Sequence, residues 1–176
     1  LGLSAFLDAN TERRELLLGQ RPPRFDSSFD EAIALTGDDF ERVALKAESA
    51  RDYFLLVGPP GTGKTSRALR RMVEHFYAAS SMQILLLAYT NRAVDEICQS
   101  LSSITPCIDY IRVGSELSCD VRFRGHLLEN ILAECNSRRE VNIRMADCRV
   151  YVGTVASIAA KAELFKLKRF DVAIVD

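Results

Sequence analysis

Short apolar runs alternate along the chain with segments in which apolar residues recur every three or four positions. The runs lie at residues 53–57, 83–88, 110–113, 149–152 and 171–176. Runs of this length predict buried strands, whereas the spacing between them is typical of helices that pack one face on a sheet. The alternation therefore predicts an α/β fold with a mainly parallel sheet and right-handed crossovers.

Helical signals appear before the first strand. Residues 1–34 predict a helical lead-in, which Pro22 and Pro23 interrupt. Asp38, with Glu41 three positions later, predicts the N-cap of a further helix. We expect its apolar face to consist of Phe40, Val43, Ala44 and Ala47.

Further helices are expected between the remaining strands of the chain. A helix that starts at Thr65 has an apolar face formed by Ala68, Leu69, Met72, Val73, Phe76 and Tyr77. The same spacing predicts helices at residues 94–101 and 155–165. Residues 114–147 are more polar and give one expected helix, with inward-facing Leu128, Ile131, Leu132 and Cys135.

Composition places the chain among ordinary globular proteins, with 48% hydrophobic and 27% charged residues in 176. The net charge of -1 excludes a global basic field, so any nucleic-acid binding must come from local contacts. No apolar run approaches the roughly 20 residues that span a bilayer, and no cleavable signal is apparent at the start. We therefore expect no membrane association and a cytosolic location.

The cysteines and histidines do not predict a metal or redox site. The five cysteines are widely spaced and form no C-x-x-C pair. We expect buried free thiols, and structural roles for His75 and His126.

A glycine-rich loop between the first strand and the helix at Thr65 carries the strongest chemical signal. It matches the pattern G-x-x-x-x-G-K-T, with the residues Gly58, Pro59, Pro60, Gly61, Thr62, Gly63, Lys64 and Thr65. Glycines let backbone N–H groups curl around phosphates, and the following helix adds its positive dipole end. We expect this loop to bind the phosphates of ATP, with Lys64 on the β- and γ-phosphates and the Thr65 hydroxyl on Mg2+.

A second signal is the apolar strand at residues 171–176, which ends in a carboxylate. Asp176 lies at the C-terminal end of that strand, where open α/β sheets build their sites. We interpret Asp176 as the Walker B aspartate, which holds Mg2+ through its water shell. Lys64 and Asp176 are therefore the catalytic candidates.

Four segments together resemble the motifs of superfamily 1 helicases. They are residues 58–65, 86–96, 152–157 and 170–176, and they resemble motifs I, Ia, Ic and the start of II. The likeness is to the branch of the nonsense-mediated-decay RNA helicase and the flap-processing DNA nuclease-helicase. The likeness implies a three-layer, RecA-like P-loop NTPase domain over residues 35–176. It also implies that the intact protein is an ATP-dependent helicase and NTP hydrolase that acts on single-stranded DNA or RNA.

The resemblance also implies site residues. Thr90 and Asn91 in the second motif and Thr154 in the third would touch the nucleic-acid backbone, although Thr90 and Asn91 also fit a strand-to-helix turn with an N-cap. Phe40 stands near the place where the family has an adenine-binding glutamine, so it is either a core residue or an aromatic that stacks on the base.

Asp176 is the last residue, and we expect the groups that complete catalysis to lie elsewhere in an intact parent. These are the glutamate after Asp176, the later motifs and a second RecA-like domain with its arginine fingers. By itself the chain is expected to be inactive in hydrolysis. Two alternatives remain open, an AAA+ remodelling ATPase and a non-catalytic nucleotide-dependent interaction module.

Overall fold

The computed structural model describes residues 6–79 and 81–176, which divide into two compact units between Val57 and Gly58. The boundary that the sequence predicts between residues 34 and 35 lies inside the first unit. Residues 1–5 of the expected lead-in lie outside the described part. The extent of the expected ATP-binding domain, residues 35–176, therefore remains a prediction.

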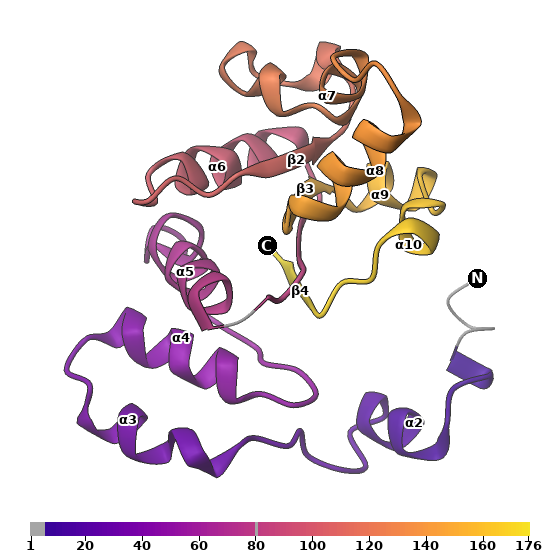
Figure 1. Cartoon of the computed structure of the whole chain (residues 1–176). Helices are drawn as coiled ribbons and strands as arrows, with labels where there is room; N and C mark the ends of the chain where they lie inside the picture. Colours follow the sequence, from indigo (N-terminus) through magenta and orange to yellow (C-terminus); the bar gives the residue numbers. More distant parts are fainter. Residues whose placement is uncertain (1–5, 80) are drawn as a thin grey trace. The chain divides into compact units, whose positions relative to one another are not determined.

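The first unit is helical, as expected. Its elements are α2 (Thr11–Leu17), η1 (Ser27–Phe29), α3 (Asp30–Leu35) and α4 (Asp39–Ser49) (Figure 1). Asp38 caps α4 by accepting from the backbone N–H groups of Phe40 at 2.8 Å and Glu41 at 3.4 Å, so the predicted N-cap is confirmed. Hydrogen bonds from Arg21 and Arg24 hold the pKa of Asp52 well below its usual range and tie the segment before η1 to the one after α4.

The predicted strand at residues 53–57 is absent, so that prediction was wrong. The segment is irregular, and every second side chain is exposed: Tyr53 by 39%, Leu55 by 75% and Val57 by 92%. An extended segment becomes a strand only where a neighbour accepts its backbone hydrogen bonds, and within residues 6–79 and 81–176 no strand pairs with it. An apolar run indicates burial but does not specify that partner.

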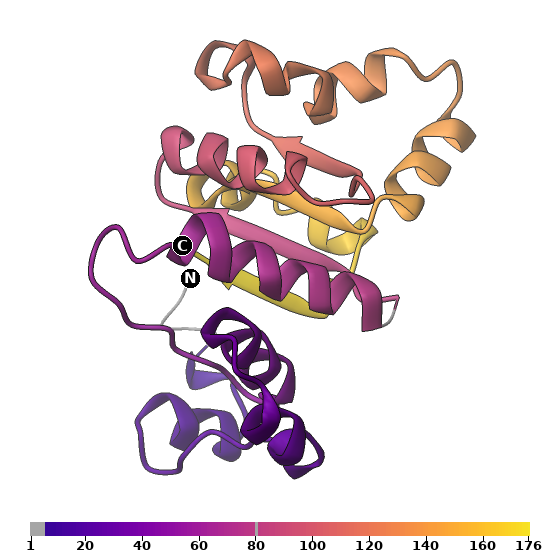
Figure 2. The same cartoon turned by 90° about the vertical axis from the view of Figure 1, so that its left-hand side faces the viewer.

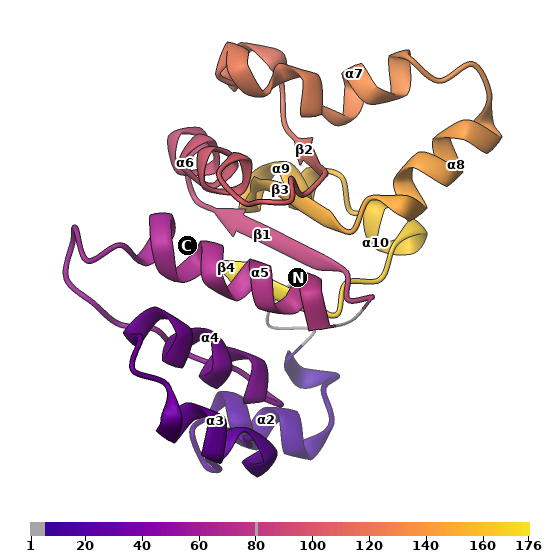
Figure 3. The same ribbon diagram turned by 60° about the vertical axis from the view of Figure 1, so that its left-hand side comes forward.

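The second unit is built on a four-stranded sheet in the order β2-β3-β1-β4. The strands are β1 (Ile84–Ala88), β2 (Tyr110–Val113), β3 (Val150–Thr154) and β4 (Val172–Val175) (Figure 3). All three pairings are parallel, and Leu86 of β1 lies opposite Val152 of β3 and Ile174 of β4. The prediction of a parallel sheet is therefore confirmed, with its four downstream strands in the expected places.

Helices cover both faces of this sheet and make three layers. On one face lie η2 (Lys64–Leu69), α5 (Arg70–Ala79) and α6 (Asn91–Ser102), and on the other lie α9 (Val155–Ala160) and α10 (Leu164–Leu167) (Figures 1 and 2). Leu85, Ile111 and Tyr151 pack with Ile158 of α9 and Leu164 of α10. Alternate strand residues, such as Ile84 and Leu86, point to the opposite face and are fully buried. The unit is thus an α/β, RecA-like P-loop domain.

Residues 114–147 contain more structure than the sequence predicts. They form η3 (Glu116–Ser118), η4 (Val121–His126), α7 (Leu128–Ala133) and α8 (Arg138–Asp147). Leu128 and Ile131 of α7 are buried as expected, whereas Cys135 lies beyond the helix end. The helix α8 has no buried residue, so apolar spacing gives no signal for it. The helix expected at residues 155–165 is divided into α9 and α10.

Gly153 allows β3 to lie close to its neighbours. A Cβ placed on it would lie 2.9 Å from the backbone oxygen of Val113 and 3.2 Å from Cγ1 of Ile158. We expect Gly153→Ala to lower the free energy of unfolding by about 1–3 kcal/mol, because the buried contact is overpacked. Urea unfolding measures the change. Gly114→Ala is the matched control, since a Cβ there meets nothing within 4 Å, and equal loss in both variants would contradict the packing argument.

Candidate nucleotide-binding site

The loop from Gly58 to Thr65 folds back on itself before η2. Gly61 has a φ of 80° and Gly63 a φ of 82°, in the left-handed region that side chains disfavour. The Lys64 Nζ donates to the backbone oxygens of Gly58 at 2.6 Å and Pro59 at 2.8 Å. The ammonium charge therefore lies against the loop backbone, and the two glycines explain why this sequence can make the turn.

The helix after the loop does not begin with a regular α-turn. Gly63 O accepts from the backbone N–H groups of both Arg67 and Ala68 at 2.9 Å, and Lys64–Leu69 forms a π-helical turn before α5. Turns of this kind are frequent at functional sites. The sequence predicted an ordinary helix from Thr65, so the π turn is a correction, although the predicted apolar positions Ala68 and Leu69 are buried.

Thr65 and Asp176 meet, although 111 positions separate them in the chain. The Thr65 Oγ1 donates to the Asp176 carboxylate at 2.6 Å. The backbone N–H of Asp176 donates to Leu87 O at 2.8 Å, which holds the end of β4 against β1. A hydroxyl and a carboxylate oxygen at one point are hard oxygen donors of the kind that Mg2+ prefers, so this pair fits the ion that the sequence predicts.

The three predicted nucleic-acid contacts lie at or just beyond the carboxyl ends of β1 and β3. Ala88 and Thr154 are partners in the parallel register, and Thr90 lies two residues beyond Ala88. Thr90 caps α6 through Ala93 N at 3.1 Å, and Thr154 caps α9 through Ser157 N at 3.0 Å. Thr90 is exposed, whereas Thr154 is only 6% exposed. The N-cap interpretation is confirmed for Thr90, and contact with nucleic acid remains a prediction.

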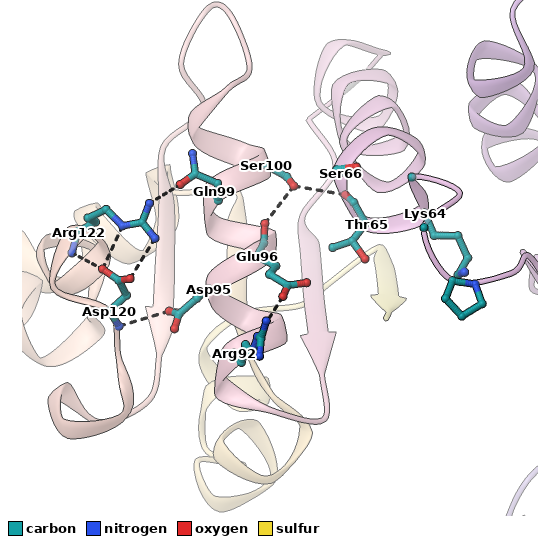
Figure 4. Close-up of a pocket in the computed structure, with 13 residues that line it drawn as sticks. Lys64, Thr65, Ser66, Arg92, Asp95, Glu96, Gln99, Ser100, Asp120 and Arg122 are labelled. Carbon is teal, nitrogen blue, oxygen red and sulfur yellow. Dashed lines mark hydrogen bonds and ion pairs between the residues drawn. The ribbon is translucent and has the colours of Figure 1, made fainter.

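A cavity of about 720 Å³ joins the glycine-rich loop to α6 and η4. One wall is formed by Pro60, Gly61, Gly63, Lys64, Thr65 and Ser66. The opposite wall consists of polar residues, Arg92, Asp95, Glu96, Gln99, Ser100, Asp120 and Arg122 (Figure 4). Three residues of this second wall, Arg92, Asp95 and Glu96, belong to the helicase-like segment 86–96. The sequence predicted no site role for them.

Hydrogen bonds hold the second wall in place. Arg122 donates to Gln99 Oε1 at 2.7 Å and to Asp120 (Figure 4). The bonds to Asp120 from the Arg122 side chain and backbone N–H lower the pKa of that carboxyl to about 2. Asp120 in turn donates its backbone N–H to Asp95, which forms an ion pair with Arg112 of β2. The Arg112 side chain is 1% exposed. An arginine inside an apolar strand is the sequence signal that could have found this network, because a buried charge needs a partner.

The described part of the chain also shows where the cysteines lie and how the helices are built. Among the described residues no group of three or more His, Cys, Asp and Glu side chains could hold a metal ion. The free thiols Cys98, Cys119 and Cys148 are buried as expected. Cys107 is exposed and Cys135 only half-buried, so the prediction was wrong for these two. Burial raises the pKa of Cys98 to about 11. None of the described helices has the length and apolar character needed to cross a membrane.

Phe40 lies half-buried on α4. His126 stacks on Tyr110 with ring centroids 3.9 Å apart, as a structural histidine would. A role of Phe40 in base recognition remains a prediction.

Residues 36–147 match the sequence family described as AAA domain. The chain belongs to this family. JHS1 of Arabidopsis thaliana, a DNA replication ATP-dependent helicase/nuclease, is 29% identical over 99% of this chain and 13% of its own length. ECM32 of Saccharomyces cerevisiae, which carries the name of an ATP-dependent RNA helicase, is 32% identical over 58% of this chain and 9% of its own length.

DNA2 of Bos taurus, another DNA replication ATP-dependent helicase/nuclease, is 27% identical over 96% of this chain and 17% of its own length. The AAA domain match and these helicase relatives confirm the resemblance to superfamily 1 helicases and to their nonsense-mediated-decay and flap-processing branch. The chain spans less than a fifth of the length of each of these three relatives.

Proposed function

We propose that this chain is the ATP-binding motor domain of an ATP-dependent helicase that acts on single-stranded nucleic acid. The observation that carries the proposal is the 2.6 Å hydrogen bond from Thr65 to Asp176. Thr65 is the last residue of a loop with the P-loop pattern. Thr65 and Lys64 line one cavity, and the Asp176 carboxylate joins that site through its bond with Thr65. Helicase names among the relatives support the same function.

The residues at the loop would have separate roles with Mg-ATP. The backbone of residues 58–65 would bind the phosphates, and Lys64 would leave its two carbonyl partners to contact the β- and γ-phosphates. Thr65 and Asp176 would hold Mg2+, directly or through its waters. Bound Mg2+ would neutralise charge that develops on the transferred phosphoryl group.

Nucleic acid would bind along the carboxyl edge of the sheet. Thr90, Asn91 and Thr154 follow adjacent parallel strands there, and hydroxyl and amide groups bind a phosphate backbone without reading its sequence. We further propose that a second RecA-like domain completes the active site in the intact protein, since phosphoryl transfer needs charge compensation from arginines. The expected cytosolic location remains a prediction.

The two alternatives are less well supported. The family description contains the term AAA, but the named relatives are helicases, which favours a helicase over a remodelling ATPase. A non-catalytic, nucleotide-dependent interaction module would use the same Thr65 and Asp176 pair, and the helicase names among the relatives favour a helicase over it as well. Nucleic-acid-stimulated ATP hydrolysis separates the proposal from both.

Thr90→Asp in the intact protein is expected to reduce nucleic-acid stimulation of ATP hydrolysis by about tenfold or more. This is the size of effect expected when one hydrogen bond to a charged phosphate is lost. Aspartate is as good an N-cap as threonine, so α6 keeps its cap, but the carboxylate repels phosphates at this exposed position. Phosphate release with and without single-stranded DNA or RNA measures the effect, which should not depend on base sequence.

Alanine at Thr90, Asn91 or Thr154 should also lower stimulation while nucleotide affinity stays nearly the same.

Ser137→Asp is the matched control, because Ser137 caps α8 in the same way, through Glu140 N at 3.2 Å. It should leave stimulation unchanged. If Thr90→Asp keeps full stimulation, or loses nucleotide binding and fold together, Thr90 serves only as a helix cap and the proposed strand-binding edge is wrong.

A further inference from the structure

Ser100 connects the helix α6 to the loop that carries Thr65. Its side chain is on the flank of α6 that faces η2, and the residue is only 7% exposed. Its Oγ donates to the backbone oxygen of Glu96 in its own helix at 3.0 Å and lies 3.3 Å from the backbone oxygen of Thr65 (Figure 4). The hydroxyl therefore bridges two elements that lie 35 positions apart.

Comparison with Ser102 separates the bridge from an ordinary helix bond. Serine in a helix often donates to the carbonyl four residues earlier, and Ser102 does so to Cys98 O at 2.9 Å. Ser102 is exposed, and its bond to Cys98 O lies within α6. Ser100 makes the same kind of local bond and in addition reaches Thr65, so of these two serines Ser100 is the one that contacts the loop.

The bridged residue, Thr65, lies in the π-helical turn and faces Asp176. Its Oγ1 is 2.6 Å from the Asp176 carboxylate. Threonine is β-branched and has few allowed χ1 rotamers, so the position of its Oγ1 depends on where its backbone lies. The Ser100 hydroxyl proton, shared between the Glu96 and Thr65 carbonyls, holds the Thr65 backbone and so limits the positions open to the Thr65 hydroxyl.

We propose that Ser100 is a positioning residue for the Mg2+ ligand Thr65. This inference rests on the proposed function, since it takes Thr65 as a ligand of Mg2+ that accompanies ATP. Ser100 touches neither phosphate nor metal in this account. It acts through the Thr65 backbone, so its loss should affect nucleotide binding only where Mg2+ takes part.

The test is the affinity of the chain for a fluorescent ATP analogue, with Mg2+ and with the metal removed by EDTA. We expect Ser100→Ala to weaken binding about threefold to tenfold with Mg2+, the equivalent of one ordinary hydrogen bond, and to leave metal-free binding unchanged. Ser100→Thr retains the hydroxyl and should restore the affinity. Ser102→Ala should change neither value, and Ser100→Cys provides a second variant of nearly the same size if alanine impairs folding.

Each outcome has a distinct meaning. Equal affinity for Mg-ATP in Ser100→Ala and the unsubstituted chain overturns the inference and leaves the proposed function intact. Equal weakening with and without Mg2+ also overturns it, because Ser100 would then support the fold in general. Absence of binding in the unsubstituted chain, by contrast, refutes the proposed function itself.

Discussion

Lys64→Ala is expected to weaken Mg-ATP binding by roughly tenfold to a hundredfold, the range for loss of charge-assisted hydrogen bonds. Lys64 supplies a point charge inside the loop, where it is held by the backbone oxygens of Gly58 and Pro59 and is partly shielded from water. Its removal leaves the phosphates without that charge, whereas Gly61 and Gly63 still shape the turn. Titration with a fluorescent nucleotide measures the loss.

Lys161→Ala controls for the general removal of a lysine, because Lys161 pairs with Glu129 at 3.1 Å and does not line the cavity. Its affinity for Mg-ATP should equal that of the unsubstituted chain. A folded Lys64→Ala variant that binds Mg-ATP as tightly as the unsubstituted chain would show that the loop is not a phosphate site.

Asp176→Asn is expected to reduce the contribution of Mg2+ to ATP binding by about tenfold to a hundredfold, as for other partners of a metal ion. Asparagine retains the size of the side chain and can still accept from Thr65, but it lacks the negative charge that attracts the cation. In the intact protein, hydrolysis should fall further, by about 10² to 10³, because Mg2+ also stabilises charge in the transition state. Binding measured across a Mg2+ titration reports the first effect.

Asp171→Asn is the matched control at the other end of the same strand. Asp171 accepts from the backbone N–H of Gln83 at 2.8 Å, and asparagine retains an oxygen for that bond. We expect Mg2+ dependence to be unchanged in this control. If both variants lose affinity equally, the defect lies in the docking of β4 on β1 and Asp176 is not a metal partner.

The site residues predicted from sequence are those whose signals are local. Gly61, Gly63, Lys64 and Thr65 lie in one short pattern, and Asp176 ends an apolar strand. Chain spacing also located β1 and β3, whose parallel pairing puts Ala88 beside Thr154. The strand positions are predicted correctly because burial is encoded within a few neighbouring residues, whereas the roles of the site residues remain predictions.

The features that sequence missed depend on partners far along the chain. Residues 53–57 have a strand-like apolar run, but pairing is a property of two segments, and the structure pairs this one with no described strand. Ser100 appears in sequence as an unremarkable helix residue, and only the fold brings it to Thr65. Arg112 and Asp95 are likewise ordinary until β2 and α6 bring them together.

Nucleic-acid-stimulated ATP hydrolysis by the intact protein that contains this chain tests the proposed motor function most directly. Phosphate release is measured at saturating Mg-ATP, with and without single-stranded DNA or RNA, for the unsubstituted protein and Lys64→Ala. We predict turnover that rises strongly when the strand is added and that is lost in Lys64→Ala. Turnover that does not rise when single-stranded DNA or RNA is added, or that persists at the same rate in Lys64→Ala, would contradict the proposed motor function.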